Sequence, residues 1–236
     1  MSETSTATAG PETPVGEIVA ADPAAARVFE ALQIDFCCGG KSSLAEACEP
    51  RGLDPATVLA MIAATDRLPA TAGDDHDLGD ASIEQICEHV VASHHNRARE
   101  ELERIAALAE KVERAHAASN PRLHDLRSRF TDLRHEMESH MDTEESVVFP
   151  ACLQVSGDGP DLEPLLVEHE AEHGEIGAEL AVIRDLADDY DEDRAFCNTH
   201  RVLLHSLREF EIDTHQHVHE ENNVLFPRVR EAAAAA

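Results

Sequence analysis

A stretch of eleven residues occurs twice in the chain, at 140–150 and again 77 positions later at 217–227. Each copy begins with a histidine, has a glutamate four residues further on, and ends in Val-Val-Phe-Pro or Val-Leu-Phe-Pro. Residues four apart lie one turn from each other on the same face of an α-helix. The repeat therefore predicts two helices that each present an imidazole and a carboxylate, and two such helices facing each other can bind two metal ions.

The composition favours an all-α protein. Hydrophobic residues make up 42% of the 236-residue chain and aromatic residues only 3%, a mixture that suits helices better than strands. The net charge of −29 argues against nucleic acid or an anionic membrane as a partner. The sequence has no apolar run long enough to span a membrane and no hydrophobic leader, so we expect a cytoplasmic protein with reduced cysteines.

We expect five segments along the chain. A Ser, Thr, Ala, Gly and Pro-rich start lacks the apolar residues needed to fold, and a polar, Gly-containing stretch separates two helical parts. The segments are a disordered lead at 1–13, a small helical domain at 14–68, a linker at 69–80, a four-helix bundle at 81–230 and a tail at 231–236.

The bundle is predicted from apolar residues that recur at spacings of three and four. Helices are expected at about 82–117 and 121–154, followed by two more, in an up-down-up-down arrangement with short connections. Polar residues occur within the apolar stripes of the last three helices. The positions expected to face inward include His140, Glu144, Val147, His169, His173, Phe196, His217 and Glu221.

Two adjacent histidines compete for the inward position on the first helix. His95 shares the apolar stripe of Ala98 and Leu102, whereas His94 is one step off it, so His95 is preferred and His94 is the alternative. His200 is in phase on the fourth helix but far from Glu221, and is expected in the core or at its rim. The remaining histidines are predicted to be solvated surface residues: His76, His89, His116, His124, His135, His205, His215 and His219.

The buried imidazoles and carboxylates need a partner from outside the chain. Burying such a group without compensation costs on the order of several kcal/mol. A single buried histidine is ordinarily a core residue with satisfied hydrogen bonds, but six such groups enter this core, and no in-phase Lys or Arg neutralises Glu144 or Glu221. Ligation by imidazole and carboxylate without thiolate favours iron or manganese over structural zinc. We therefore predict two non-haem iron ions, bridged by carboxylates and an oxo group.

The chain resembles a known family in these motifs. The bundle is similar to the haemerythrin-like domains, and together with residues 15–19 and Ile34-Asp-Phe-Cys-Cys-Gly-Gly-Lys41 it resembles the iron-sulfur cluster repair di-iron proteins over about residues 14–230. The resemblance implies repair of clusters damaged by nitric oxide or oxidants, and a homodimer. It also implies six iron ligands, with the two glutamates bridging: His95, His140, Glu144, His173, His217 and Glu221.

His169 departs from that six-ligand pattern. It stands one turn before His173 on the same stripe, giving the H-x-x-x-H pair of oxygen-binding haemerythrins. Two hypotheses stand equally: His169 is a seventh ligand, or it orients a water bound to the metal.

Cys37 and Cys38 are adjacent and are followed by two glycines. We expect that neighbouring thiols cannot easily face one small cavity, and that a disulfide between them would be strained and reducible. The glycines permit close backbone approach. By resemblance, the two thiols are hypothesised to pass electrons or iron between the bundle and a client protein; the plainer alternative is a turn of buried small residues.

Three functions fit these residues. The first is a di-iron protein that acts on damaged iron-sulfur proteins by iron donation or by removal of nitric oxide, either stoichiometrically or as an enzyme that reduces nitric oxide. The second is a haemerythrin-like sensor or carrier of oxygen or nitric oxide, which His169 favours. The third is iron storage, for which the negative charge is mild support.

Overall fold

The computed structural model describes residues 9–65, 78–155 and 160–235. Within these ranges the chain is all-α, as predicted, with helices, one isolated bridge between Pro14 and Ser43, and no strand. Most of the expected lead and linker lies outside the described residues, as do His76 and the end of the tail. No helix in the described part of the chain has both the length and the apolar character that a membrane span requires.

The chain divides into two compact units. The first comprises Met1–Ala81 together with His219–Val224, and the second comprises Ser82–Val218 together with Leu225–Ala236. The short segment His219–Val224 therefore belongs to the first unit although the second unit flanks it in the sequence.

Four short helices build the N-terminal part of the first unit. The hydroxyl of Ser43 accepts a hydrogen bond from the Glu46 N–H, and the Glu46 carboxylate accepts one from the Ser43 N–H at 2.9 Å. This capping box satisfies N–H groups that the start of a helix leaves free. The helices are α1 (Val15–Ala21), α2 (Ala25–Ala31), α3 (Leu44–Cys48) and α4 (Pro55–Thr65), and Val15, Phe29, Phe36 and Leu44 are fully buried among them.

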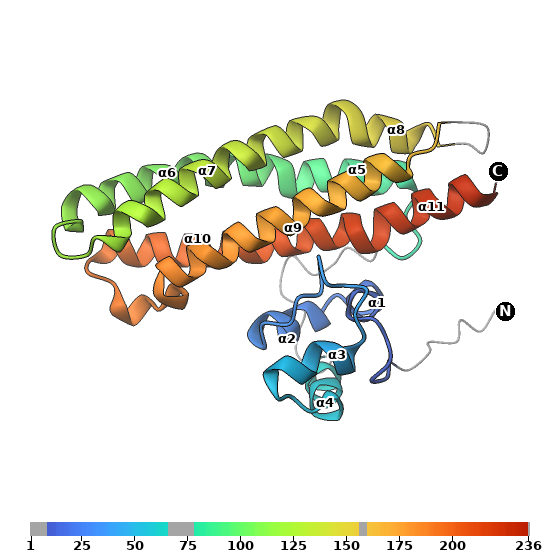
Figure 1. Cartoon of the computed structure of the whole chain (residues 1–236), viewed down its shortest axis with the longest axis horizontal. Coiled ribbons are helices and arrows are strands. Elements are labelled where there is room, and N and C mark those ends of the chain that lie inside the picture. Colours follow the sequence, from blue (N-terminus) through green and yellow to red (C-terminus); the bar gives the residue numbers. More distant parts are fainter. Residues whose placement is uncertain (1–8, 66–77, 156–159, 236) are drawn as a thin grey trace. The chain divides into compact units, whose positions relative to one another are not determined.

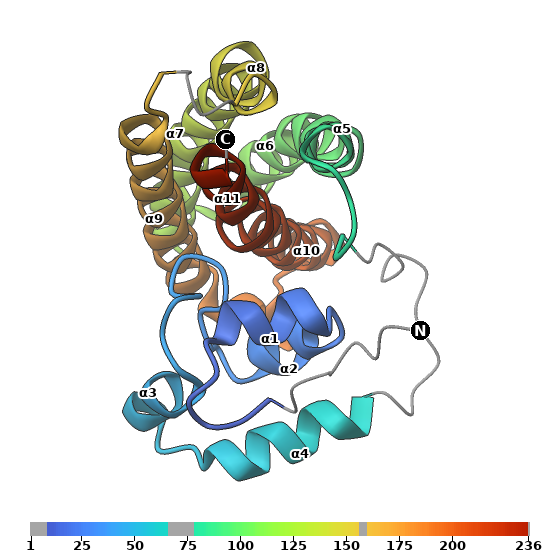
Figure 2. The same cartoon turned by 90° about the vertical axis from the view of Figure 1, so that its right-hand side faces the viewer.

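The second unit is the predicted four-helix bundle (Figure 1). Short connections join successive helices, so that neighbours run in opposite directions. The first helix is α5 (Ile83–Val90) continued by α6 (Asn96–His116), the second is α7 (Arg122–Thr143) continued by α8 (Phe149–Leu153), the third is α9 (Glu163–Leu186), and the fourth is α10 (Asn198–Glu220) continued by α11 (Phe226–Ala235). Figure 2 shows α6, α7, α9 and α10 from one end, arranged around a common core.

Three of the four bundle helices contain a π-helical turn, at Val91–His95, Glu144–Val148 and Glu221–Leu225. A π turn adds one residue to a helical turn, so side chains beyond it are rotated by about 100° relative to an unbroken α-helix. The expectation that Val147 faces the core is therefore wrong: its side chain is 49% exposed, and Val148 is buried instead. The repeated sequence motif thus encodes a repeated π turn as well as a repeated pair of side chains.

A second inward position was also wrongly predicted. Phe196 is 47% exposed because α10 begins only at Asn198, so the helical periodicity does not extend back to it. Its ring stacks on His200 at a centroid distance of 5.0 Å. His200 is buried, as expected for a histidine in the core or at its rim.

Candidate metal centre

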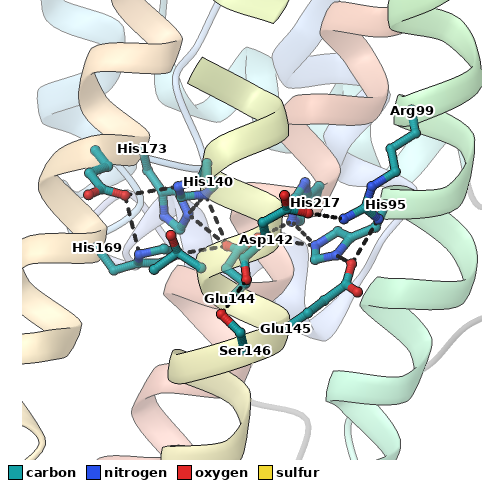
Figure 3. Close-up of polar contacts among 12 residues, drawn as sticks. His95, Arg99, His140, Asp142, Glu144, Glu145, Ser146, His169, His173 and His217 are labelled. Carbon is teal, nitrogen blue, oxygen red and sulfur yellow. Dashed lines mark hydrogen bonds and ion pairs between the residues drawn. The ribbon is translucent and has the colours of Figure 1, made fainter. Parts of the chain in front are cut away.

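Glu144 lies at the middle of a group of buried histidines (Figure 3). Its carboxylate is fully buried, and Oε1 lies 3.0 Å from His140 Nε2, 2.7 Å from His169 Nε2 and 3.6 Å from His173 Nε2. These three histidines come from the second and third bundle helices. One oxygen of Glu144 therefore faces three imidazoles.

The other oxygen of Glu144 faces two more histidines. Oε2 lies 3.1 Å from His95 Nε2 and 3.8 Å from His217 Nε2. These histidines come from the first and fourth helices, so all four helices contribute to the centre. A carboxylate with its two oxygens directed to separate sets of imidazoles has the geometry of a bridging ligand between two metal ions.

Glu221 completes both sets. It follows His217 by one turn along the fourth helix, and its carboxylate is fully buried. The side chains form two groups, and within each group the potential ligand atoms all lie within 4.8 Å of one another. Both groups contain Glu144 and Glu221. One group is His140, Glu144, His169, His173 and Glu221; the other is His95, Glu144, His217 and Glu221.

The outward contacts of the imidazoles fit a cation at their centre. His95 Nδ1 lies 2.8 Å from a Glu145 oxygen, and His140 Nδ1 lies 3.0 Å from a Glu172 oxygen. Both rings therefore turn Nε2 toward Glu144. There His95 Nε2 lies 3.2 Å from His217 Nε2, and His140 Nε2 lies 3.0 Å from His173 Nε2. Imidazole nitrogens and carboxylate oxygens that converge in this way are a donor set that fits metal ions.

The electrostatics of Glu144 lead to the same conclusion. Burial raises the pKa of a carboxyl group, but hydrogen bonds from His140, His169, His173 and His95 outweigh burial and hold the pKa of Glu144 well below its usual value. Glu144 is therefore ionised at neutral pH. An ionised carboxylate among imidazoles is a donor set for a hard or intermediate cation such as iron.

The structure places His95 rather than His94 in this centre. His94 is also buried, but its ring stacks on His217 at 5.5 Å and its Nδ1 lies 3.4 Å from Asp213. His169 lies as close to Glu144 as any other histidine, and its ring stacks on His140 at a centroid distance of 4.3 Å. All seven residues selected from the sequence are thus brought together.

Sequence reasoning missed the outer carboxylates Glu145 and Glu172, which lie within hydrogen-bonding distance of His95 and His140 on the side away from Glu144. A local signal existed, since Glu145 adjoins Glu144 and Glu172 adjoins His173. The surface of this chain is so acidic that neither residue stood out. Helical phase alone cannot show which acid of a solvent-facing row contacts an imidazole.

His219 was wrongly predicted to be a solvated surface residue. It is buried in the first unit, where its ring contacts Phe36 at a centroid distance of 5.6 Å and its Nδ1 lies 3.2 Å from the Asn223 side chain. Burial lowers the pKa of His219 to about 4. His219 is therefore neutral at physiological pH.

The thiols of Cys37 and Cys38 lie close together. Their Sγ atoms are 3.8 Å apart, and Cys37 Sγ donates to Asp35 Oδ1 at 3.4 Å. Asp35 also accepts hydrogen bonds from the N–H groups of both cysteines, which curl the backbone around its carboxylate. The hydrogen bond with Cys38, burial and the nearby Asp35 raise the pKa of Cys37 well above its usual value.

The glycines beside the cysteines accommodate the side chain of Asn223. The Asn223 amide donates to the Cys37 carbonyl at 3.1 Å and to the Phe36 carbonyl at 3.3 Å. A Cβ atom at Gly40 or Gly16 would overlap the Asn223 amide oxygen. The second glycine of the motif is therefore required by close approach, as the sequence suggested.

A four-helix bundle with buried histidine and glutamate ligands from every helix is a haemerythrin-like bundle, and comparison with known families agrees. Residues 88–235 match the family described as Hemerythrin HHE cation binding domain, and residues 11–66 match a family described as Domain of Unknown function (DUF542). The chain therefore carries a cation-binding bundle preceded by a second, separately defined domain.

Similar proteins extend over nearly the whole chain. The iron-sulfur cluster repair protein YtfE of Pectobacterium carotovorum subsp. carotovorum (strain PC1) is 34% identical over 91% of this chain and 95% of its own length. The proteins of the same name from Edwardsiella ictaluri (strain 93-146) and Musicola paradisiaca (strain Ech703) are 35% and 34% identical, over 91% and 92% of this chain and 95% and 96% of their own lengths. The chain belongs to this family of iron-sulfur cluster repair proteins.

Proposed function

We propose that the protein repairs iron-sulfur clusters damaged by oxidative or nitrosative stress, using two iron ions bound in the bundle. The relatives that match over nearly the whole chain are named for cluster repair. The proposed ligands are His95, His140, Glu144, His173, His217 and Glu221, and His169 is either a seventh ligand or a residue that orients a bound water.

The observation that carries the proposal is the arrangement around Glu144. Its two oxygens face different sets of histidines, and Glu221 is common to both sets. Two metal ions that share two carboxylates explain this arrangement, whereas a single ion would leave one set of imidazoles without a partner. The iron pair supplies one-electron chemistry and labile iron when bound.

The side chains of the protein would control how that iron is held and released. Glu144 is ionised and would neutralise part of the charge of both ions, and the imidazoles would offer Nε2 to them. Neutral imidazoles and carboxylates bind iron less permanently than thiolate cages do, which suits donation to a damaged cluster. Removal of nitric oxide is the second route that the same site allows, through a position at one iron that the protein leaves open.

Reactivation of a damaged enzyme tests this function. A [4Fe-4S] hydratase inactivated by peroxide or nitric oxide is incubated anaerobically with the iron-loaded protein, with the metal-free protein, or with an equal amount of free ferrous iron. We expect the loaded protein alone to restore activity quickly, and iron to leave it in proportion to the activity regained. Equal recovery with free iron or with metal-free protein would contradict the proposal.

A haemerythrin-like carrier of oxygen or nitric oxide is the second candidate, because His169 lies within 2.7 Å of Glu144 and can fill an additional position at one iron. The optical spectrum of the reduced, iron-loaded protein separates the two functions as oxygen is admitted and withdrawn. A band that appears and disappears reversibly supports a carrier. Irreversible oxidation supports repair.

Two further properties follow from the family resemblance and belong to the same proposal. We expect the protein to act in the cytoplasm on damaged iron-sulfur proteins and to form a homodimer. Light scattering coupled to size-exclusion chromatography, at a chain mass of 25.7 kDa, tests the oligomeric state: a mass near that of one chain would contradict the dimer.

A further inference from the structure

Two partly exposed carboxylates support the centre from outside. Glu145 Oε1 lies 2.8 Å from the Nδ1 atom of His95 (Figure 3). Glu172 Oε2 lies 3.0 Å from the Nδ1 atom of His140. Their side chains are 35% and 46% exposed, so neither is itself a buried ligand. Each contacts histidines that face a different oxygen of Glu144.

The two carboxylates are held in different ways. Glu145 is fixed by Arg99, whose guanidinium lies 2.8 Å from Glu145 and 2.9 Å from Asp142. Glu172 has no arginine or lysine within ion-pair distance among the residues the structure describes. Arg99 therefore restrains Glu145 on one side of the centre, whereas no described arginine or lysine restrains Glu172 on the other side.

Glu172 serves two rings with one oxygen. Besides His140, its Oε2 lies 3.4 Å from His169 Nδ1, and the rings of His140 and His169 are stacked with an interplanar angle of 7°. A carboxylate beside Nδ1 restricts the orientation of an imidazole and turns Nε2 toward the centre. Glu172 thus contacts both His140 and the one histidine that exceeds the six-ligand pattern.

We propose that Glu145 and Glu172 are positioning residues that act on different irons, and that Glu172 determines whether His169 binds the iron beside His140. The inference rests on the di-iron centre proposed above. Because Glu172 is half exposed and lacks a cationic anchor, its withdrawal into solvent frees His169 and opens a position at that iron. The iron on the side of His95 keeps its support through Arg99.

Iron release and Mössbauer spectroscopy test the two supports separately. The protein is loaded with ⁵⁷Fe, and release of iron to a ferrous chelator such as ferrozine is followed in the reduced state. We expect Glu172→Ala to accelerate release of one of the two irons about 10- to 100-fold, the usual effect of losing an outer partner of a metal ligand. Glu172→Gln, which keeps a neutral acceptor, is expected to have a smaller effect on the same iron.

Glu145→Ala is expected to accelerate release of the other iron, and Arg99→Gln to act on that iron more weakly. Each variant should change one of the two Mössbauer quadrupole doublets and leave the other unchanged. Glu175→Ala on α9 and Glu136→Ala on α7 remove exposed carboxylates from the same helices and should change neither.

Imidazole ¹⁵N NMR of the metal-free protein provides a readout that needs no iron. Glu172→Ala should alter the Nδ1 signals of His140 and His169 and leave that of His95 unchanged. The inference would be overturned if every variant changed the release rates of both irons, or if the control variants changed them equally. The release of iron to a chelator needs no client protein, so it tests the positioning role independently of repair. If the variants release their two irons separately but the iron-loaded protein does not reactivate the hydratase, the repair function is rejected and the positioning role is retained.

Discussion

The two halves of the bundle use the same helices to bury different chemistry. In the half away from the centre, an apolar cluster fills the core, and Phe130 and Phe210 pack edge to face with a centroid distance of 6.1 Å. Its buried carboxylate, Glu211, is neutralised by Arg184, whose Nε lies 3.0 and 3.1 Å from the two oxygens. Around Glu144 the core holds five histidines, and among the residues that the structure describes no arginine pairs with its carboxylate.

This difference shows how one fold separates stability from function. The apolar half is complete without any ligand, because its packing is dense and its buried charge has a partner within the chain. The metal half carries groups whose burial is unfavourable until cations arrive. Iron should therefore matter to one half of the bundle far more than to the other.

Loss of a large core side chain should have the largest effect, and it should fall on stability alone. Phe130→Ala is expected to lower the free energy of unfolding by about 3 to 5 kcal/mol, because a fully buried ring leaves a cavity. Iron bound per chain, measured after loading at low temperature, should not change. A loss of iron by a variant that is still folded by circular dichroism would mean that the halves are not independent.

Breaking the internal ion pair should come next. Arg184→Met leaves Glu211 buried without its cation and is expected to cost about 3 kcal/mol by chemical denaturation. The double variant Arg184→Met/Glu211→Leu should recover most of that loss, since both charges are gone. If the double variant were as unstable as the single one, packing rather than charge would explain the effect.

Removal of iron should separate the two halves directly. Iron at 100 times its dissociation constant stabilises the folded state by about 2.7 kcal/mol. We expect hydrogen exchange in the metal-free protein to speed up at the π turns Val91–His95 and Glu144–Val148, and to change little around Phe130 and Phe210. If hydrogen exchange became faster by the same factor throughout the bundle, the two halves would not differ in their dependence on iron.

The register of the π turn predicts a smaller and more local contrast. Val148→Ala should destabilise the protein by about 2 kcal/mol because its side chain is fully buried,. Val147→Ala, one residue earlier and half exposed, should change stability by less than about 0.5 kcal/mol. Thermal unfolding of the two variants measures the difference, and the reverse order would show that the helix continues without a π turn.

The sequence was sufficient to predict the class of fold, and the residues that it selected for the centre lie together in the structure. Long stripes of apolar residues predicted the bundle. His140 precedes the π turn Glu144–Val148 and Glu144 is its first residue, so the extra residue of the turn does not shift their phase. His169 and His173 lie on α9, which is α-helical throughout. His95 was separated from His94 by phase alone, and the structure agrees.

What the sequence could not predict depends on departures from the ideal α-helix and on contacts between distant residues. The wrong position of Val147 follows from one extra residue in a turn, which no apolar pattern of this length reveals. The burial of His219 and the fit of Asn223 against Gly40 depend on segments more than 180 positions apart in the sequence. The outer carboxylates Glu145 and Glu172 belong to a surface with many equivalent acids.

The Mössbauer spectrum of the ⁵⁷Fe-loaded, air-oxidised protein, recorded together with the iron content per chain, tests the central claim most directly. Glu144 and Glu221 shared between two sets of histidines predict two irons per chain that are magnetically coupled, with no paramagnetic splitting at low temperature. A single iron per chain, or two irons with the spectrum of isolated paramagnetic ions, would contradict a carboxylate-bridged pair.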